Sequence, residues 1–204
     1  QRWFARAGGA RGEDPYFLYA ASNAGSFLAL LAYPFLVEPL ASLSQQGRAW
    51  SWGFGAAGLL WAACARAASG ADPAPEATAP ASWGERLLWV ALAAVPSSLM
   101  LGATSHLTVN IAPVPLLWVV PLAVYLATYV GAFSSAGPAL TAWCAAAAPL
   151  AGLAWAFAGA FDLGTKPQIL LHLGVLSVLA GALHGRLAAS RPPASRLTEF
   201  YLCA

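Results

Sequence analysis

Long apolar runs, separated by short polar or proline-containing segments, dominate this chain. Windows of apolar residues set against charges and helix breakers give six candidate helical spans, at about 15–37, 49–65, 87–107, 115–133, 139–161 and 167–185. About 20 consecutive apolar residues suffice to cross the hydrocarbon layer of a bilayer. The pattern therefore predicts an all-α fold: a polytopic transmembrane helical bundle of about six spans within residues 15–185.

Turn-forming residues separate several of these spans. Pro113 and Pro115, in the segment NIAPVP, cannot continue a helix from the third span into the fourth. The segment SSAGP has the composition of a turn between the fourth and fifth spans. Residues 66–86 are rich in Ala, Pro and acidic residues, which cannot bury a core, so we expect a flexible loop there.

The composition agrees with a membrane protein. Apolar residues make up 59% of the 204 residues and charged residues only 9%, against roughly 25% charged in ordinary soluble domains. No charge occurs between Arg86 and Asp162. The net charge is only +2 and the basic residues do not cluster with aromatics, so we expect lipid and other membrane helices or subunits as partners, and no nucleic acid.

The basic residues divide unequally between the two sides of the predicted bundle. Eight fall on the side that holds both ends of the chain and two on the other. Cytoplasmic loops of membrane proteins are enriched in Lys and Arg, so both ends are expected to be cytoplasmic. Residues 1–14 would then be a cytoplasmic lead-in, and residues 186–204 a cytoplasmic segment with the start of a further helix. The first group is Arg2, Arg6, Arg11, Arg66, Arg86, Arg186, Arg191 and Arg196; the second is Arg48 and Lys166.

Aromatic residues gather near the predicted ends of the spans, where amphipathic rings anchor helices at the membrane interface. We expect this anchoring role, rather than ligand stacking, for Tyr16, Tyr19, Trp50, Trp52, Trp83 and Trp89.

Two spans carry a polar face. At 100° per residue, the polar residues of the first span share about a third of the helix circumference. A second polar face lies on the third span. Such faces either pack helices together or line a substrate path, and periodicity does not distinguish the two. The residues are Tyr19, Ser22, Asn23, Ser26 and Tyr33 on the first span, and Ser97, Ser98, Thr104, Ser105 and Thr108 on the third.

No charge lies in the middle of a predicted span, where charges are costly and usually functional. Glu38 ends the first span and Asp162 ends the fifth, both on the predicted outer side. The two carboxylates could form an acidic mouth for a cation, or they could be solvated loop residues.

The histidines and cysteines show no metal-binding spacing. His106, His172 and His184 include no i, i+4 pair, and no carboxylate accompanies them. His172, a few residues inside the sixth span, could ligate a haem or chlorophyll or could be a hydrogen-bonded packing residue. The cysteines, Cys64, Cys144 and Cys203, are interpreted as small apolar fillers.

Sequence signatures of enzymes are absent: the chain has no P-loop, GxSxG or HExxH motif. We therefore expect no catalytic residue, metal site or cofactor in these 204 residues. The segment GALHG, residues 181–185, has the small-xxx-small spacing of closely packed membrane helices, and we expect it to serve such a contact.

Several blocks resemble one protein family. The segment YAASNAG, followed by small residues and AYPFLVEP, resembles the membrane part of the bacterial fused major-facilitator and spermidine-synthase-like proteins. The blocks PSSLMLGATSHLTVNIAPVPLLWVVPLAVYL and RLTEFYL look like further parts of it. The resemblance implies a bacterial inner (cytoplasmic) membrane location, additional helices before Gln1 and after Ala204, and a linked aminopropyltransferase-like domain. The nucleotide-binding loop of such a domain has no counterpart here, so its activity is not carried over.

Two functions are compatible with these features. The first is a transporter-like or scaffold membrane domain of such a fusion protein, which would handle a small organic cation such as a polyamine. The alternative is an accessory subunit of a larger respiratory or photosynthetic membrane complex, which the Gly, Ala and Trp content and the lack of buried charge would suit.

Overall fold

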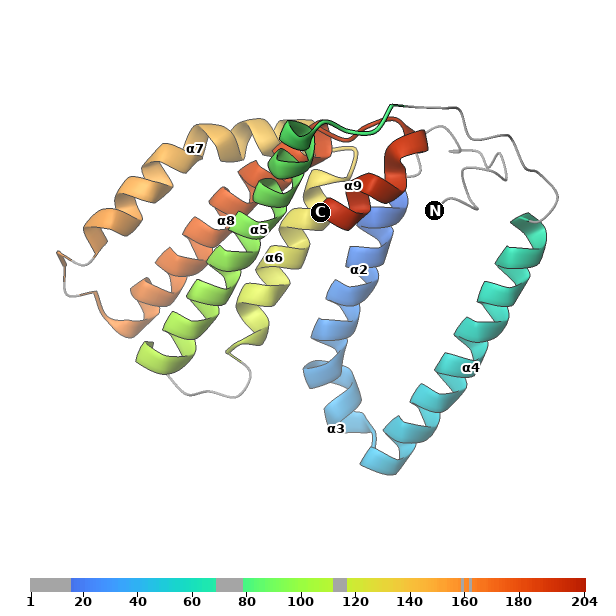
Figure 1. The fold of residues 1–204 in the computed structure, drawn as a ribbon. Helices are drawn as coiled ribbons and strands as arrows, with labels where there is room; N and C mark the ends of the chain where they lie inside the picture. Colours follow the sequence, from blue (N-terminus) through green and yellow to red (C-terminus); the bar gives the residue numbers. More distant parts are fainter. Residues whose placement is uncertain (1–15, 69–78, 112–116, 159, 162) are drawn as a thin grey trace.

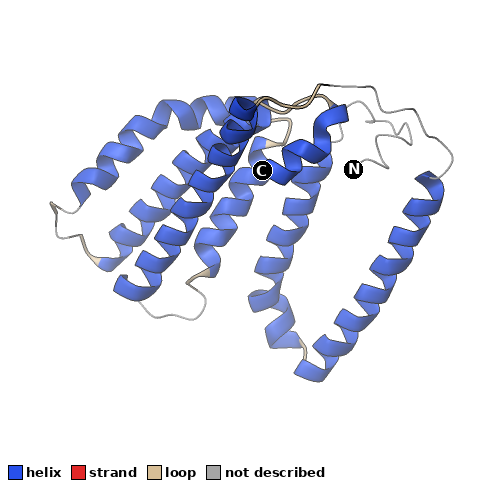
Figure 2. Cartoon of the chain, viewed as in Figure 1, coloured by secondary structure: helices blue, strands red, loops and turns tan. Residues whose placement is uncertain are grey.

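The computed structural model describes residues 16–68, 79–111, 117–158, 160–161 and 163–204. Every regular element in these ranges is a helix, as the sequence predicts (Figure 2). In chain order they are α2 (Phe17–Ala32), the π-helical η1 (Tyr33–Val37), α3 (Glu38–Leu40), α4 (Leu43–Ala68), α5 (Trp83–His106), the π-helical η2 (Leu107–Ile111), α6 (Val119–Ala132), α7 (Gly137–Ala158), α8 (Thr165–Ala189), the 3-10 turn η3 (Ala194–Arg196) and α9 (Leu197–Cys203).

Four helical segments of the described chain are long and apolar enough to cross a membrane: Phe17–Leu40, Trp83–Val109, Gly137–Ala158 and Thr165–Ala189. They correspond to the first, third, fifth and sixth predicted spans. The other two predicted spans are helical but are not both long and apolar enough to cross a membrane. Helix α6 has 14 residues, or about 21 Å at 1.5 Å per residue, against a hydrocarbon core of about 30 Å. Helix α4 has 26 residues, but tryptophan, serine and glycine dilute its apolar residues.

Helices α2, α5, α6, α7 and α8 pack together, and the last four, which follow one another in the chain, alternate in direction (Figure 1). Helix α8 is central, because it packs closely against α5, α6 and α7, while α2 packs against α6. Among the described residues, helix α4 belongs to none of the closely packed pairs, and it stands away from the other helices in Figure 1. Helix α9 lies across the end of the bundle where α2 and α5 begin and α8 ends. We call this the α9 end and the opposite one the far end.

Local signals set several boundaries. Helix α5 begins with a capping box: the Ser82 side chain accepts the Glu85 N–H, and the Glu85 side chain accepts the Ser82 N–H. The predicted loop at 66–86 is therefore shortened at both ends, since residues 66–68 belong to α4 and 83–86 to α5; its centre, residues 69–78, lies outside the described residues. Residues 134–136 form the predicted turn between α6 and α7. The lead-in at 1–14 and the break at Pro113 and Pro115 also lie outside the described residues.

The core corrects part of the prediction for interfacial aromatics. Trp89 and Tyr16 are only 1% and 3% exposed, and they surround the fully buried ring of Phe200 from α9 at centroid distances of 5.3 and 5.5 Å. Tyr19 is also partly buried against this core. These rings are buried because α9 packs over the first turns of α2 and α5. The position of a ring near the end of a predicted span gives no sign of this contact. Trp50, Trp52 and Trp83 are exposed, as interfacial anchors would be.

The contact between α7 and α8 depends on glycines. A Cβ atom at Gly181 would come within 2.7 Å of the Cys144 sulfur, and one at Gly185 would overlap the Thr141 side chain. Only a residue without a side chain permits this approach of the two helices. The small-xxx-small prediction for residues 181–185 is thus confirmed, and buried Cys144 acts as the small filler expected of it.

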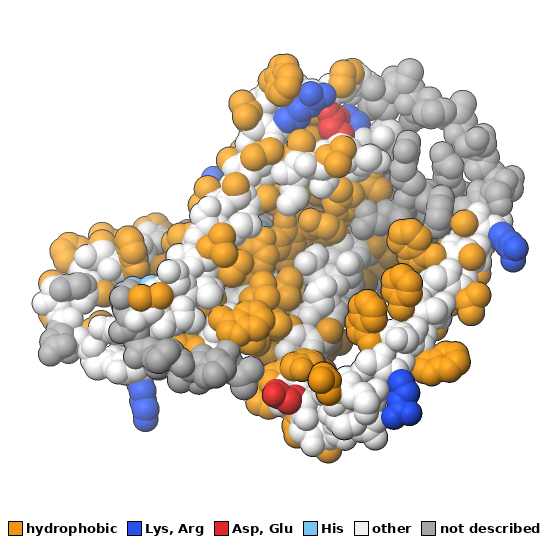
Figure 3. Space-filling view, turned by 60° about the horizontal axis from the view of Figure 1, so that its bottom comes forward, with side chains coloured by type: hydrophobic (Ala, Val, Ile, Leu, Met, Phe, Trp, Pro, Cys, Tyr) orange, Lys and Arg blue, Asp and Glu red, His pale blue; other side chains and the backbone are white. Residues whose placement is uncertain are grey.

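Large apolar side chains cover much of the outer surface. Figure 3 shows hydrophobic side chains spread across one face, with charged ones near its margins. On the two flanking helices, α4 and α7, the exposed tryptophans are Trp50, Trp52, Trp61, Trp143 and Trp155. Such a surface suits lipid or other apolar helices, in agreement with a membrane protein.

Candidate functional site

The polar face of α2 mostly satisfies its hydrogen bonds within its own helix. The Asn23 side-chain amide donates to the Tyr19 carbonyl at 2.9 Å, and the Ser26 hydroxyl donates to the Ser22 carbonyl at 3.3 Å. Ser22, Ser26 and Tyr33 are exposed. Tyr19 differs, because its ring packs against Tyr129 of α6 at 5.4 Å between centroids.

The polar face of α5 behaves similarly. Thr104 donates to the Met100 carbonyl and Thr108 to the Thr104 carbonyl, each at 2.8 Å, while Ser98 and Ser105 are exposed. Ser97 reaches another helix: its Oγ lies 3.1 Å from the Tyr125 hydroxyl of α6. One residue from each predicted face, Tyr19 and Ser97, therefore joins side chains of α6.

These contacts belong to a group of buried and half-buried polar side chains between α2, α5, α6 and α8. At its centre lies His184 of α8, which is 0% exposed. Its ring centroid is 3.9 Å from that of Tyr129 and 4.9 Å from that of Tyr125, the latter edge to face. We call the group the Tyr/His cluster; its members are Tyr19, Ser97, Tyr125, Thr128, Tyr129 and His184.

The hydrogen-bond distances around Thr128 favour one tautomer of His184. Thr128 Oγ1 lies 2.7 Å from the Tyr125 carbonyl and 3.0 Å from His184 Nδ1. We assign the single hydroxyl hydrogen of Thr128 to the Tyr125 carbonyl, which can only accept and gives the shorter of the two contacts. Thr128 must then accept from the ring, and in the neutral imidazole Nδ1 carries the hydrogen. His184 Nε2 is left as a bare acceptor.

The same reasoning applies to Ser97 and Tyr125. Ser97 donates to the Ala93 carbonyl at 2.9 Å, so its hydrogen is used within α5. The Tyr125 hydroxyl therefore donates to Ser97 Oγ across 3.1 Å. Each of these two chains of hydrogen bonds ends on a backbone carbonyl. The hydrogens of Ser97, Tyr125, Thr128 and His184 Nδ1 therefore all have acceptors.

One acceptor is left over. His184 Nε2 is buried and has no hydrogen-bond partner among the residues that the structure describes. A buried polar atom without a partner costs roughly 1–3 kcal/mol, and native structures hold few of them. An ionisable side chain inside a membrane bundle is a candidate functional position.

A separate polar network holds α9 against α5. Arg86 binds Glu199 through two nitrogens, Nη2 at 2.6 Å and Nε at 2.7 Å from Oε1, and the Ala81 N–H donates to Glu199 Oε2 at 3.1 Å. The Ala81 N–H and the Arg86 guanidinium together lower the pKa of Glu199 below its ordinary value. We call these three residues the α9 clamp.

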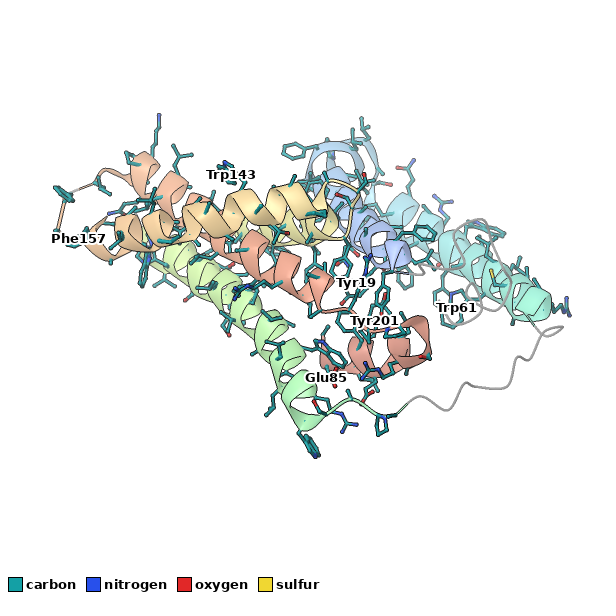
Figure 4. The ribbon with its side chains drawn as sticks, turned by 90° about the horizontal axis from the view of Figure 1, so that it is seen from above. Tyr19, Trp61, Glu85, Trp143, Phe157 and Tyr201 are labelled. Carbon is teal, nitrogen blue, oxygen red and sulfur yellow. The ribbon has the colours of Figure 1, made fainter. Side chains whose placement is uncertain are left out.

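Tyrosine rings connect the α9 end to the Tyr/His cluster. Tyr201 of α9 and Tyr19 of α2 lie side by side, with centroids 4.6 Å apart (Figure 4). Tyr19 also packs against Phe133 at 5.1 Å. A movement of α9 would therefore change the packing of Tyr19 directly.

The other predicted site residues do not join this group. Glu38 is exposed at the far end, and its predicted partner Asp162 lies outside the described residues. The His172 ring stacks on that of His106, with centroids 4.3 Å apart, and its Nδ1 donates to the Gln168 carbonyl at 2.8 Å. Parallel stacked imidazoles do not aim their nitrogens at a shared point. Within the described residues, no group of three or more His, Cys, Asp or Glu side chains could hold a metal ion.

The α6 residues of the cluster were not among the predicted site residues. Tyr125, Thr128 and Tyr129 have i, i+3, i+4 spacing and so share one helix face, a signal of the same kind as those read on α2 and α5. His184 was overlooked in favour of His172, because it was placed at the inner end of its span. Its position between Gly181 and Gly185, which bring α7 close, was the available sign of burial.

Comparison with known proteins adds no relative: no family model, curated protein or solved structure matches the chain.

Proposed function

We propose that this chain is the transporter-like membrane domain of a spermidine-synthase-like fusion protein and that it handles a small organic cation. The observation that carries the proposal is the Tyr/His cluster, with its buried and unpartnered His184 Nε2. A domain that served only as a scaffold would have no use for this unsatisfied atom, because a packed apolar side chain would be more stable there.

A small cation is the proposed substrate class for two reasons. Tyrosine ring faces are electron-rich and attract cations within about 6 Å, and three tyrosines line the cluster. The family resemblance of the sequence blocks independently points to polyamine chemistry. Glu38, exposed at the far end, could take part in the first encounter with such a cation.

The proposed orientation places the α9 end in the cytoplasm of a bacterium, with the chain in its inner membrane. The support is the distribution of basic side chains. Arg66 and Arg186 lie in the last turns of α4 and α8, and Arg86 and Arg196 lie at the α9 clamp or beside it. Arg48 and Lys166 lie at the far end, near the starts of α4 and α8. Positive residues favour the cytoplasmic side.

Uptake into proteoliposomes tests this function. The 204-residue chain is reconstituted, and entry of labelled 1,4-diaminobutane is followed against liposomes without protein. We expect faster, saturable uptake that unlabelled diamine competes away. Gly174→Ala is the matched variant, because a Cβ there meets open space, and it should transport like the wild type. Uptake equal to that of empty liposomes would exclude transport of this cation.

An accessory subunit of a larger membrane complex is the second candidate. The observation in its favour is α4, which carries exposed Trp50, Trp52 and Trp61 and belongs to no closely packed helix pair. Gentle extraction from the native membrane tests it: stable co-migration with other subunits that is lost in Trp50→Ala/Trp61→Ala supports this candidate. Migration as the isolated chain rejects it.

A further inference from the structure

The Tyr/His cluster has a definite hydrogen-bond polarity. Its four assigned donors, the hydroxyls of Ser97, Tyr125 and Thr128 and the His184 Nδ1–H, are all directed to acceptors. The surplus atom is an acceptor, His184 Nε2. A group that binds Nε2 must therefore donate a hydrogen bond to it, which excludes carboxylates, phosphates and other pure acceptors as the partner of this nitrogen.

The surroundings of Nε2 narrow the choice further. A metal ion would need further ligands, and the described residues offer no group of three or more His, Cys, Asp or Glu. The rings of Tyr129 and Tyr125 instead lie 3.9 and 4.9 Å from the imidazole, between centroids. Ring faces stabilise a cation without any formal counter-charge, as in the aromatic cages that bind ammonium groups.

We propose that His184 Nε2 is the binding point for the primary ammonium group of an amine, with the rings of Tyr125 and Tyr129 as its cation–π partners. The ammonium donates one N–H to Nε2 and places its charge against the ring faces. Thr128 is a positioning residue, because its hydroxyl holds the hydrogen on Nδ1 and so keeps Nε2 free to accept. This inference rests on the proposed function and names the residues that recognise the substrate.

The site is closed in this structure. Nε2 has no contact with solvent, and the rings around it pack at ordinary aromatic distances. Binding therefore requires the rings to move apart.

The test is equilibrium binding of labelled 1,4-diaminobutane to the purified chain in lipid nanodiscs. His184→Phe keeps an aromatic ring but removes the acceptor nitrogen, and loss of one charge-assisted hydrogen bond should weaken binding about 10- to 100-fold. His172→Phe is the matched control on the same helix, because His172 is outside the cluster and its Nδ1 is bonded to its own helix. It should bind the amine like the wild type.

A second measurement uses the wild-type chain and so does not depend on correct folding of the His184→Phe variant. In the wild-type chain with 15N-labelled histidine, added diamine should shift the Nε2 resonance of His184 and leave those of His172 unchanged. If the wild type binds the amine but both the His184→Phe affinity and the His184 resonance are unaffected, this site is wrong while the proposed function stands. If the wild type neither binds nor transports the amine, the proposed function fails together with the site.

Discussion

Helix α8 contacts its two neighbours in opposite ways. Toward α7 it presents Gly181 and Gly185, and the helices approach so closely that no side chain fits between them at these positions. Toward α6 it presents His184, which fills the space with a polar ring, hydrogen-bonded to Thr128 and left with one free acceptor. The α7–α8 contact has the features of helix packing that serves stability. The α6–α8 contact contains a buried acceptor without a partner, His184 Nε2. Such an atom does not stabilise the packing of the helices, so we expect it to have a functional role.

The largest expected effect lies on the α7 side. Gly185→Ala would place a methyl group into Thr141, and overpacking of this kind costs about 1–3 kcal/mol. The free energy of unfolding, measured in mixed micelles with increasing SDS, should fall accordingly. Gly174→Ala, on the same helix but facing open space, should leave it unchanged or slightly raised. Equal losses in the two variants would mean that α7 does not pack on α8 as described.

A smaller effect is expected on the α6 side. Thr128→Val keeps the shape of the side chain but removes the acceptor of the His184 Nδ1–H. Hydrogen bonds between membrane helices contribute about 0.6 kcal/mol on average and up to about 1.7, so the unfolding free energy should fall within that range. The control is Thr104→Val, whose hydroxyl bonds a carbonyl of its own helix. A double-mutant cycle with His184→Phe should show coupling for Thr128 and none for Thr104.

The smallest effect on overall stability is expected at the α9 clamp, which holds α9 against α5. The depressed pKa of Glu199 means that its carboxylate contributes stability at pH values above the ordinary glutamate pKa of about 4.3. This contribution is lost as the pH falls through the depressed value. The NMR signal of labelled Phe200, packed between Tyr16 and Trp89, should therefore change on acidification below pH 4.

Carboxylate variants separate this local effect from general acid unfolding. Glu199→Gln should give the altered Phe200 signal already at neutral pH, because the amide cannot replace the charge that pairs with Arg86. Glu38→Gln, at the exposed far end, should not. A Phe200 signal that is identical in all three proteins across this pH range would show that the α9 clamp does not hold α9.

Local patterns predicted the fold class and part of the packing. The lengths of the apolar runs predicted the helices, and the spacing of Gly181 and Gly185 predicted a close helix contact without naming α7 as the partner. Both signals depend on residues close together in the chain. Four of the six predicted spans are long and apolar enough to cross a membrane. Apolar character alone did not reveal that α6 has only 14 residues.

The Tyr/His cluster could be predicted only in part. Tyr19 and Ser97 were identified from polar faces on α2 and α5, but which members of those faces point inward depends on where α6 and α8 lie. The burial of Trp89 and Tyr16 likewise depends on α9, which follows them by more than a hundred residues. No periodicity within a single helix contains that information.

The position of the imidazole hydrogen on His184 is the most direct test of the proposed amine site, because that site requires an unprotonated Nε2. The measurement is a 15N NMR spectrum of the chain with labelled histidine, in lipid and without amine, at a pH where the imidazole is neutral. The structure predicts that the hydrogen of His184 is on Nδ1 and that Nε2 gives the resonance of an unprotonated nitrogen. In Thr128→Val this preference should weaken. A wild-type spectrum with the hydrogen on Nε2 would contradict the assigned hydrogen bonds and remove the acceptor on which the site depends.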